Sequence, residues 1–402
     1  MGRDRQPTDR SPLPTVVWRI GWVSLFTDAA TDMVYPLLPA FLRSIGGGAR
    51  WLGIVEGVAE AVAALVKWRT GALVDRHQKK KQLVLIGYGI SSAIRPLLAL
   101  ALAPWHVVLI RALDRVGKGV RSAPRDAILV AAVSPAQRAA AFGAHRMMDN
   151  MGAVFGPLLA FVLMGFAHLD LRTILALAVV PGALAVAMLV FGVKEPIDAT
   201  AVAVDRPAAS THPPPFPPAL KRYFVAVGLF SLGASADSFL LLRLSQQGLS
   251  EVWLPIAWLS LNLARSALNL PGGRLADRYG RKRVLMLAWL IYALVYAAFP
   301  FAHQIAETWA LLIVYAAYSG LAEGSEKAIA ADLAPKELRG RAFGTLAAVT
   351  GLAVLPANAL FGVLFDVAPL YAFGTSAVFA LVGAIVLRTV ATEDDGRGGR
   401  SR

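Results

Sequence analysis

Long, nearly uncharged apolar runs constrain this chain more than any other feature of its sequence. The segments 83–103, 173–193 and 373–390 hold at most one charged residue each. Each is about as long as a helix must be to cross the roughly 30 Å hydrocarbon core of a bilayer. Backbone groups in lipid must be bonded within the segment or in a closed barrel, and these runs lack the alternation of barrel strands. They therefore predict transmembrane helices.

Composition extends this interpretation to the whole chain. Of its 402 residues, 56% are hydrophobic, and the mean hydropathy is +0.57, which is high for a soluble domain. Apolar runs counted with their turns and flanking charges predict about twelve spans in an all-α integral membrane protein. We expect them near 15–43, 51–74, 82–103, 105–123, 139–165, 170–193, 222–247, 251–274, 284–302, 305–330, 341–365 and 368–390.

The cations of this chain mark one face of a membrane. The net charge is +14, but the Lys and Arg residues gather in the tails and in alternate loops, and only Arg43, Arg50 and Arg172 fall on the other side. This asymmetry predicts a multi-pass protein of the cytoplasmic (inner) membrane with both termini in the cytoplasm, and it argues against nucleic-acid binding. The tail 1–14 lacks the apolar region of a signal peptide. The absence of cysteine excludes disulfides and thiolate metal sites.

The chain repeats itself at half its length. The segment 71–81 (GALVDRHQKKK) returns as 273–283 (GRLADRYGRKR), and 127–143 returns as 328–344 at nearly the same offset. Two matches at one offset indicate an internal duplication. We therefore expect two pseudo-symmetric six-helix bundles joined by a linker in the cytoplasm. The domain boundaries are an N-tail at 1–14, a first bundle at 15–193, a Pro-rich linker at 194–221, a second bundle at 222–390 and a C-tail at 391–402.

These repeated loops carry a recognisable signature. The second copy resembles the loop signature of the major facilitator superfamily at Gly273, Leu275, Ala276, Asp277, Arg278, Gly280, Arg281 and Lys282. The first copy is similar at Gly71, Leu73, Asp75, Arg76, Lys79 and Lys80, with Gln78 in place of the turn glycine. The resemblance covers the whole chain. It implies a secondary transporter of a small molecule that works as a monomer in the bilayer by alternating access, without a cofactor.

A second, partial match lies on the predicted fifth span. Gly152, Gly156 and Pro157 fit the superfamily motif associated with antiporters, whereas its later glycines are Ala160 and Phe161 here. The resemblance favours export.

The loop signature also has a physical interpretation. Gly71 and Gly273 lack side chains, so we expect them to let neighbouring helices approach closely. Asp75 and Asp277 end spans that run toward the cytoplasm, where each is expected to accept bonds from a neighbouring helix terminus or to pair with arginine. Such contacts form a cytoplasmic gate. The alternative, anchoring to anionic lipid, explains Lys79–Lys81 better than it explains the aspartates.

The segment 111–126 places charges inside a predicted span. Arg111, Asp114, Arg115, Lys118 and Arg121 share one helical face. Charges at this depth are costly unless they face a partner or a wet cavity. We expect Arg111 and Arg115 to face a substrate cavity. The alternative is internal pairing with Asp114, together with extension of Arg121 to the cytoplasmic interface, and it suits Lys118 and Arg121 better.

Carboxylates on the first two spans supply a coupling hypothesis. Asp28 and Asp32 share one helix face, as do Glu56 and Glu60. A buried carboxylate binds and releases a proton as access alternates between the two sides. Our first candidates for proton coupling are Asp32, Glu60 and Asp114, followed by Asp28. Glu56 is expected too near the outer surface to take part.

The second half is poorer in midplane charge. Asp237 lies on the predicted seventh span, and Asn262, Arg265 and Asn269 recur at helical spacing along the eighth. We expect these faces either to contact a ligand or to bond neighbouring helices. His145, Arg146 and Asp149 suggest a cytoplasmic-side polar network. The six histidines form no ligand-like cluster, so we expect no metal site.

Three functions remain from sequence. The first is a proton-coupled exporter of amphipathic or drug-like compounds. The second is an organic-anion importer or exchanger that uses Arg111, Arg115 and Arg265 as clamps. The third, a lipid-modifying membrane enzyme, lacks any supporting catalytic motif, so the chain is not expected to be an enzyme.

Overall fold

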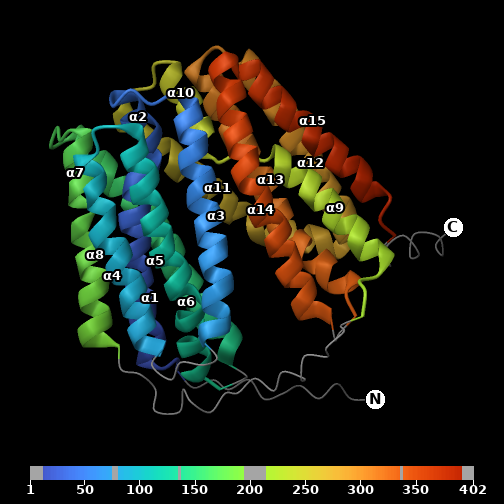
Figure 1. Ribbon diagram of the computed structural model, residues 1–402, viewed down its shortest axis with the longest axis horizontal. Coiled ribbons are helices and arrows are strands. Elements are labelled where there is room, and N and C mark those ends of the chain that lie inside the picture. Colours follow the sequence, from blue (N-terminus) through green and yellow to red (C-terminus); the bar gives the residue numbers. More distant parts are fainter. Residues whose placement is uncertain (1–11, 75–79, 135–136, 194–213, 336–337, 392–402) are drawn as a thin grey trace. The chain divides into compact units, whose positions relative to one another are not determined.

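The structure of this chain is a computed structural model (Figure 1). It describes residues 12–74, 80–134, 137–193, 214–335 and 338–391. Within those ranges the chain is helical apart from short connections, and no strand occurs. This confirms the predicted all-α membrane architecture.

The helices of the first half follow the predicted spans closely. The first two predicted spans correspond to α1 (Thr15–Val34), η1 (Tyr35–Leu37), α2 (Leu38–Ser44) and α3 (Ala49–Val74). The next four correspond to α4 (Lys80–Ile94), η2 (Arg95–Leu100), α5 (Pro104–Ala131), α6 (Arg138–Gly165), α7 (Leu171–Leu177), α8 (Val179–Ala187) and η4 (Met188–Gly192). The main difference is α5, which continues past the predicted end at 123 because buried Pro124 is accommodated inside the helix.

The second half is equally regular. Its elements are α9 (Pro218–Gly233), α10 (Ser238–Gln246), η6 (Glu251–Trp253), α11 (Leu254–Tyr279), α12 (Arg281–Ala298), η7 (Phe299–Phe301), α13 (Ile305–Leu333), α14 (Arg339–Val367) and α15 (Pro369–Arg388). Helix α9 begins inside the predicted linker, since proline is tolerated in a first helical turn. The rest of that linker, 194–213, lies outside the described residues, as do 1–11 and 392–402 of the predicted tails.

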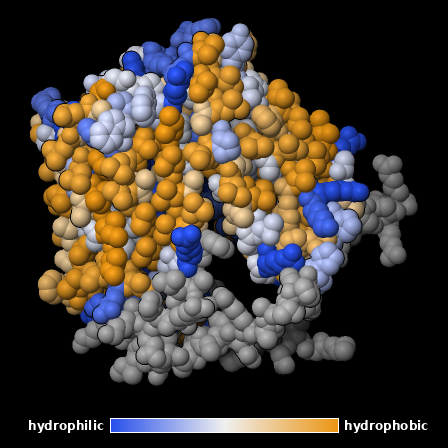
Figure 2. Space-filling view, viewed as in Figure 1, coloured by the Kyte–Doolittle hydropathy of each residue, from blue (hydrophilic) through white to orange (hydrophobic). Residues whose placement is uncertain are grey.

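Length and hydropathy separate two kinds of span. Eight helical segments of the described ranges are long and apolar enough to cross a membrane. The other four, α1–α2, α3, α5 and α11, carry the charged residues for which a cavity was predicted, except Asp237, which lies in the apolar span Pro218–Gln246. Figure 2 shows hydrophobic residues over most of the visible described surface, as lipid contact requires. The chain is therefore a multi-pass membrane protein.

Contacts divide the chain into two compact units. Unit 1 comprises the described parts of Met1–Leu37 and Val62–Ser210, and unit 2 those of Leu38–Ala61 and Thr211–Arg402. The segment 38–61 thus makes its contacts in unit 2, although it belongs by sequence to the first repeat. The predicted bundle boundaries stay a prediction.

Helix α1 packs on α6, and α4 on α5, to form most of unit 1. Val17, Val84, Ile128 and Ala185 contribute to its apolar core. The α4–α5 crossing brings backbones into contact: a Cβ at Gly117 would lie 2.5 Å from both the Gly87 carbonyl oxygen and Ser91 Oγ. Small residues at this crossing therefore set how closely the two helices pack.

Unit 2 has an aromatic core. Helix α12 packs against α13 and α15, and α9 against α14 and α15. The rings of Tyr292 and Tyr296 stack with centroids 4.0 Å apart, and those of Phe299 and Phe373 with centroids 5.1 Å apart. All four side chains are buried. Large rigid rings of this kind bury area at low conformational cost and fix the helices of the core.

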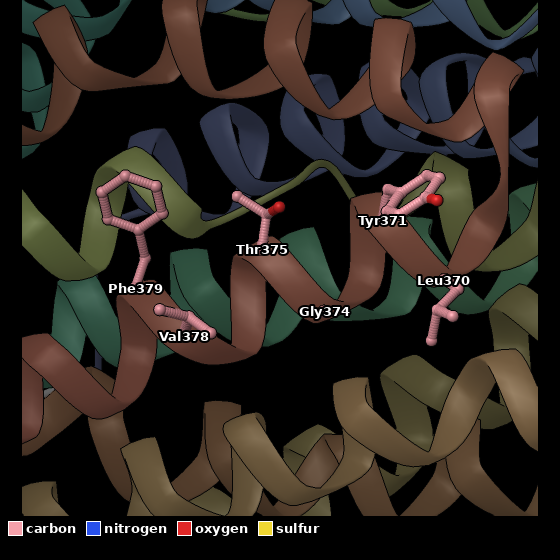
Figure 3. Close-up of a pocket in the computed structure, with 6 residues that line it drawn as sticks. All are labelled: Leu370, Tyr371, Gly374, Thr375, Val378 and Phe379. Atoms are coloured by element: carbon pink, nitrogen blue, oxygen red, sulfur yellow. The ribbon is translucent and has the colours of Figure 1, made fainter.

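A pocket of about 410 Å³ lies on α15, also in unit 2 (Figure 3). It is lined by Leu370, Tyr371, Gly374, Thr375, Val378 and Phe379. All six come from one helix, and none is charged. This groove therefore lacks the groups that would orient a polar ligand, and the candidate site lies elsewhere.

Unit 2 also contains a helix cap supplied from far along the chain. Asp366 of α14 accepts hydrogen bonds from the backbone amides of Ala49 (2.9 Å) and Arg50 (3.1 Å) at the start of α3. A Cβ at Gly362 would lie 2.5 Å from the Ala49 carbonyl oxygen, so the two helices touch through their backbones. A carboxylate at a helix N-terminus satisfies orphan amides and complements the helix dipole.

Replacing Asp366 by alanine is expected to lower the free energy of unfolding by about 1 kcal/mol, the usual effect of losing an N-terminal cap. Asp366→Asn is the control, because its amide oxygen still accepts one bond. Urea unfolding of the detergent-solubilised protein measures both. Equal destabilisation by the two variants would contradict the capping role.

Candidate functional site

The charged face predicted on α5 is largely buried in unit 1. Arg111, Asp114, Arg115 and Arg121 are 2%, 3%, 6% and 6% exposed, whereas Lys118 is exposed. The shared face is therefore real. It points into the unit, where charges must find partners.

Asp114 is the centre of an ion-pair network. Its Oδ1 accepts a hydrogen bond from Arg95 Nη2 at 2.9 Å, and its Oδ2 lies 3.8 Å from Arg111 Nη1. Arg95 also donates to the backbone carbonyl of Thr27 on α1. Asp114 thus joins η2, α5 and, through Arg95, α1. A carboxylate held in this way by two arginines is suited to a structural role and poorly suited to carrying a proton.

The sequence did not identify Arg95. It is the single charge of an otherwise apolar run, and the signal that would have found it is the cost of one unpaired cation at that depth. Its partner, 19 residues away on another helix, is set by tertiary packing.

Arg121 does not extend to the interface as predicted. Its Nη1 donates to Ser91 Oγ at 2.7 Å, and its guanidinium lies 4.5 Å from the centre of the Tyr88 ring. Gly87 makes this possible, because a Cβ there would lie 2.7 Å from Arg121 Cβ. The missing side chain on α4 leaves room for the arginine to turn inward, where a hydroxyl and an aromatic face replace water.

Carboxylates from α1 and α6 meet beside these arginines. The Asp28 carboxyl group lies within electrostatic range of Asp149 and Asp32, and of the cations Arg121 and Lys118. Asp28 and Asp32 are half-buried. The structure therefore brings Asp149, predicted in a separate polar network, to the carboxylates of α1.

His145 extends this group by one helical turn. Its Nδ1 lies 3.4 Å from Asp149 Oδ2, and the His145 side chain is only 5% exposed. The carboxylates of α1 thus connect to an imidazole on α6. Imidazole and carboxyl groups are the side chains most often used to take up and release protons.

Two glycines hold α6 against α1 at this point. A Cβ at Gly152 would lie 2.5 Å from the Leu25 carbonyl oxygen and 2.9 Å from Asp28 Cβ. A Cβ at Gly156 would lie 2.9 Å from the Met33 amide nitrogen. Pro157 follows within α6 and is buried. The predicted motif therefore lies on the helix face that contacts the α1 carboxylates.

The glutamates of α3 lie in the segment that packs with unit 2. Glu60 is half-buried, and Glu56 is 2% exposed. The burial of Glu56 does not bear on its depth in the bilayer, so its expected place near the outer surface stays a prediction.

Unit 2 has its own, partly buried ion pair. Arg265 of α11 donates from Nη1 and Nη2 to the two carboxylate oxygens of Asp237, at 2.7 and 2.8 Å. Tyr315 of α13 donates its hydroxyl hydrogen to Asp237 Oδ1 at 2.8 Å. Asn262, half-buried, lies one turn before Arg265 on α11. The structure thus brings Asp237 and Arg265, which sequence placed on separate spans, into direct contact.

Asp237 lies at a break between α9 and α10. The Ala236 amide donates to Asn358 Oδ1 at 2.7 Å, and Ser235 Oγ lies 2.9 Å from the Tyr296 hydroxyl. The Tyr292 hydroxyl donates to the Gly233 carbonyl at 3.3 Å. Side chains therefore bond two of the peptide groups at this break, the Ala236 amide and the Gly233 carbonyl, as a break within a membrane requires.

A family model described as Major Facilitator Superfamily matches residues 20–264 and 256–401. The chain belongs to the Major Facilitator Superfamily. It is accordingly a transporter and not an enzyme.

Relatives within the superfamily agree with this assignment. An uncharacterised MFS-type transporter of Methanocaldococcus jannaschii is 29% identical over 381 residues, covering 92% of this chain and 94% of its own. A homologue of the multi-drug resistance efflux pump PmrA from Lactococcus lactis is 33% identical over 168 residues, 40% of each chain. Among solved structures, the nucleoside transporter NupG shares the fold with a TM-score of 0.71 at 14% identity, covering 93% of this chain and 98% of its own.

The described residues include only part of the superfamily's loop signature. Asp75 and Arg76 lie outside the described residues, and Gly71 lies in the last turn of α3. Gly280 has φ +95°, a conformation that favours glycine, and it ends α11 and precedes α12. This explains why a turn glycine belongs in the signature.

The charged residues of the second loop signature pair with each other and with a residue of α13. Arg281 lies 3.8 Å from Asp277 and 2.6 Å from Asp332 of α13. Arg278 lies over the ring of Tyr279. The Asp277 side chain is 74% exposed, so its predicted arginine contact is formed at the surface. Pairs this exposed contribute little to stability.

The close approach predicted for Gly273 is wrong. A Cβ there would meet no atom of the described residues within 4 Å, whereas one at Gly272 would lie 3.2 Å from Leu321 Cα and against the Gly320 carbonyl. The helix contact therefore falls on the neighbouring glycine, because the rotation of α11 turns Gly272 toward α13.

Proposed function

We propose that this chain is a proton-coupled secondary transporter that exports amphipathic or drug-like molecules across the cytoplasmic membrane by alternating access, with both termini in the cytoplasm. The observation that carries the proposal is the group formed by Asp28, Asp32 and Asp149 beside His145 and Arg121 in unit 1. Titratable groups inside a transporter bundle belong to ion or substrate pathways more often than to scaffolding.

Asp28 is the main proton carrier in this proposal. Proton binding at Asp28 removes repulsion from Asp149 and Asp32, and proton release restores attraction to Arg121 and Lys118. The charge state of Asp28 therefore alters the interaction between α1 and its neighbours. Alternation between these two states couples the proton to the movement of the helices.

Asp114, a candidate for proton coupling from the sequence, has a structural role in this proposal. Its contact with Arg95 and its burial make it part of the scaffold that places α5. Asp32 remains a secondary carrier through its effect on Asp28, and Glu60 remains a candidate in the segment that packs with unit 2.

Two observations support export. Gly152 and Gly156 of the antiporter-like motif lie directly against α1, where Asp28 lies. The partial relative from Lactococcus lactis is named as a multi-drug efflux pump homologue.

One observation favours a second function, transport of organic anions. Among the described residues of unit 1, the buried charged side chains are four arginines and one carboxylate: Arg95, Arg111, Arg115, Arg121 and Asp114. An excess of buried cations attracts a carboxylate or phosphate, and arginine suits both.

Transport by proteoliposomes under an imposed pH gradient distinguishes the two functions. With the dye Hoechst 33342 as substrate, Asp28→Asn is expected to reduce gradient-driven transport at least about tenfold, because the carrier can no longer be charged. Exchange of dye across the membrane without a gradient is expected to persist. Asp126→Asn is the control, since Asp126 is half-exposed and pairs with its neighbour Arg125.

Gradient-driven transport by Asp28→Asn at the rate of the unmodified protein would disprove the coupling role. Uptake of benzoate in place of the dye, lost on neutralising Arg111 or Arg115, would support the organic-anion function.

A further inference from the structure

The guanidinium of Arg265 sits in a box made of one carboxylate and two aromatic rings. It bonds both oxygens of Asp237 and lies 5.3 Å from the ring centre of Tyr315 and 6.0 Å from that of Trp258. Carboxylates and aromatic faces are the groups that proteins use to recognise organic cations. The side chain of the protein itself thus occupies a site with the chemistry of a cation receptor.

We propose that Asp237, Tyr315 and Trp258 bind the cationic group of the transported molecule, an ammonium or a guanidinium, and that Arg265 fills this place when the molecule is absent. The proposal rests on the proposed transport function and names the substrate class that unit 2 recognises. Arg265 is then a tethered competitor.

Burial supports an exchange of this kind. The side chains of Arg265 and Asp237 are 17% and 20% exposed, whereas Tyr315 is 4% exposed. The aromatic wall is thus fixed in the core, while the ion pair is only partly enclosed. A fully enclosed pair would admit no ligand, and a fully exposed one would gain little from the rings.

Side-chain length favours a cation over an anion at this position. When a substrate cation replaces the Arg265 guanidinium, Asp237 keeps a partner, and the long Arg265 side chain can carry its own charge toward the exposed side of the pair. An anion bound to Arg265 would have to pull it from Asp237 and leave that carboxylate inside the unit with only the Tyr315 hydroxyl. Removing one partner of a buried pair is strongly unfavourable.

The backbone around Asp237 is also that of a binding site. Interrupted helices at corresponding positions of two repeats mark substrate sites in transporters built from duplicated halves. In the first repeat α1 passes into α2 through the 3₁₀ turn η1, whose first residue, Tyr35, lies 202 residues before Asp237, the same offset that separates Asp75 from Asp277. The guanidinium of Arg111 lies 5.8 Å from the Tyr35 ring centre. Each of the two corresponding positions therefore lies near an arginine, and Asp237 supplies a carboxylate at the second.

Binding measurements on the full chain in detergent, without a gradient, test the proposal. Isothermal titration calorimetry with benzylguanidinium and, separately, with benzoate gives the two affinities. Asp237→Asn is expected to weaken benzylguanidinium binding at least about tenfold, because a charged bidentate partner is lost. Arg265→Gln is expected to strengthen it by about tenfold, because the competitor is removed.

Two further variants keep the test decisive. Arg274→Gln is the matched control, since Arg274 lies on the same helix and is exposed. It should leave both affinities unchanged. Arg265→Lys preserves the charge but not the planar bidentate contact with Asp237. This variant is expected to bind benzylguanidinium with an affinity between those of the unmodified protein and Arg265→Gln. It serves as the test if Arg265→Gln does not fold.

Three results would overturn the proposal. They are weaker benzylguanidinium binding in both Arg265 variants, loss of benzoate binding in Arg265→Gln with benzylguanidinium unaffected, and no effect of any Asp237 or Arg265 variant. If the binding results contradict the cation site while Asp28→Asn loses gradient-driven transport, only the cation site is disproved. If benzylguanidinium binds as expected while Asp28→Asn transports at the full rate, only the proton coupling is disproved.

Discussion

Replacing Arg95 by methionine is expected to lower the free energy of unfolding by about 3 kcal/mol, the cost of breaking a buried ion pair from one side. The change removes the hydrogen bond to Asp114 Oδ1 and the contact with the Thr27 carbonyl. Asp114 then retains the longer contact to Arg111, 3.8 Å away. Urea unfolding of the protein in detergent micelles measures the loss.

The double variant Arg95→Met with Asp114→Leu makes this prediction specific. Replacing both partners by apolar groups removes the buried carboxylate that the single change strands, so the double variant is expected to recover much of the lost stability. Arg146→Met, on an exposed position of α6, is the control for loss of a positive charge. If the double variant is less stable than Arg95→Met, the pair is not the source of the effect.

Replacing Gly152 by leucine is expected to abolish gradient-driven transport and to lower the free energy of unfolding by about 1–3 kcal/mol, the usual range for overpacking. The new side chain would meet the Leu25 carbonyl oxygen and Asp28 Cβ, so α6 must move away from α1. That displacement separates Asp149 from Asp28. Transport of Hoechst 33342 in proteoliposomes and unfolding in urea are the two measurements.

Gly143→Leu is the matched control for this change. Gly143 lies on the same helix, and a Cβ there would meet no atom of the described residues within 4 Å. It changes helix propensity and side-chain bulk in the same way, without touching α1. Equal loss of transport in both variants would show that the contact with Asp28 is not what matters.

The arrangement of spans could be predicted from sequence because it depends on local properties. The length and apolarity of a run such as 173–193 can be read directly from the sequence. Inside lipid, such a run can form only a helix or part of a closed barrel. The prediction fails most at α5, where buried Pro124 lies within a helix that continues to Ala131. Proline ends many helices, and only the surrounding packing shows that this one goes on.

The candidate site could be predicted only in outline. The face of α5 that carries Arg111 and Asp114 follows from helical spacing. Arg95, the main partner of Asp114, cannot be predicted in this way, because the rotation of η2 against α5 depends on tertiary packing. The same reason explains why Gly272 makes the contact expected of Gly273. Spacing within one helix is local information, whereas the choice of neighbour is not.

Asn358 shows another limit. Its side chain accepts from the Ala236 amide and donates to the Val354 carbonyl of its own helix. Nothing in the sequence around 358 reveals that a helix elsewhere is interrupted and needs this acceptor. Such residues become visible only when every open peptide group is assigned a partner.

The matching positions of Tyr35 and Asp237 have an evolutionary consequence. If the two halves descend from one duplicated segment, each half was free afterwards to change its residue at this position. One position now carries a phenol and the other an acid. Under the proposed function, this divergence lets one half specialise in the ion and the other in the cargo.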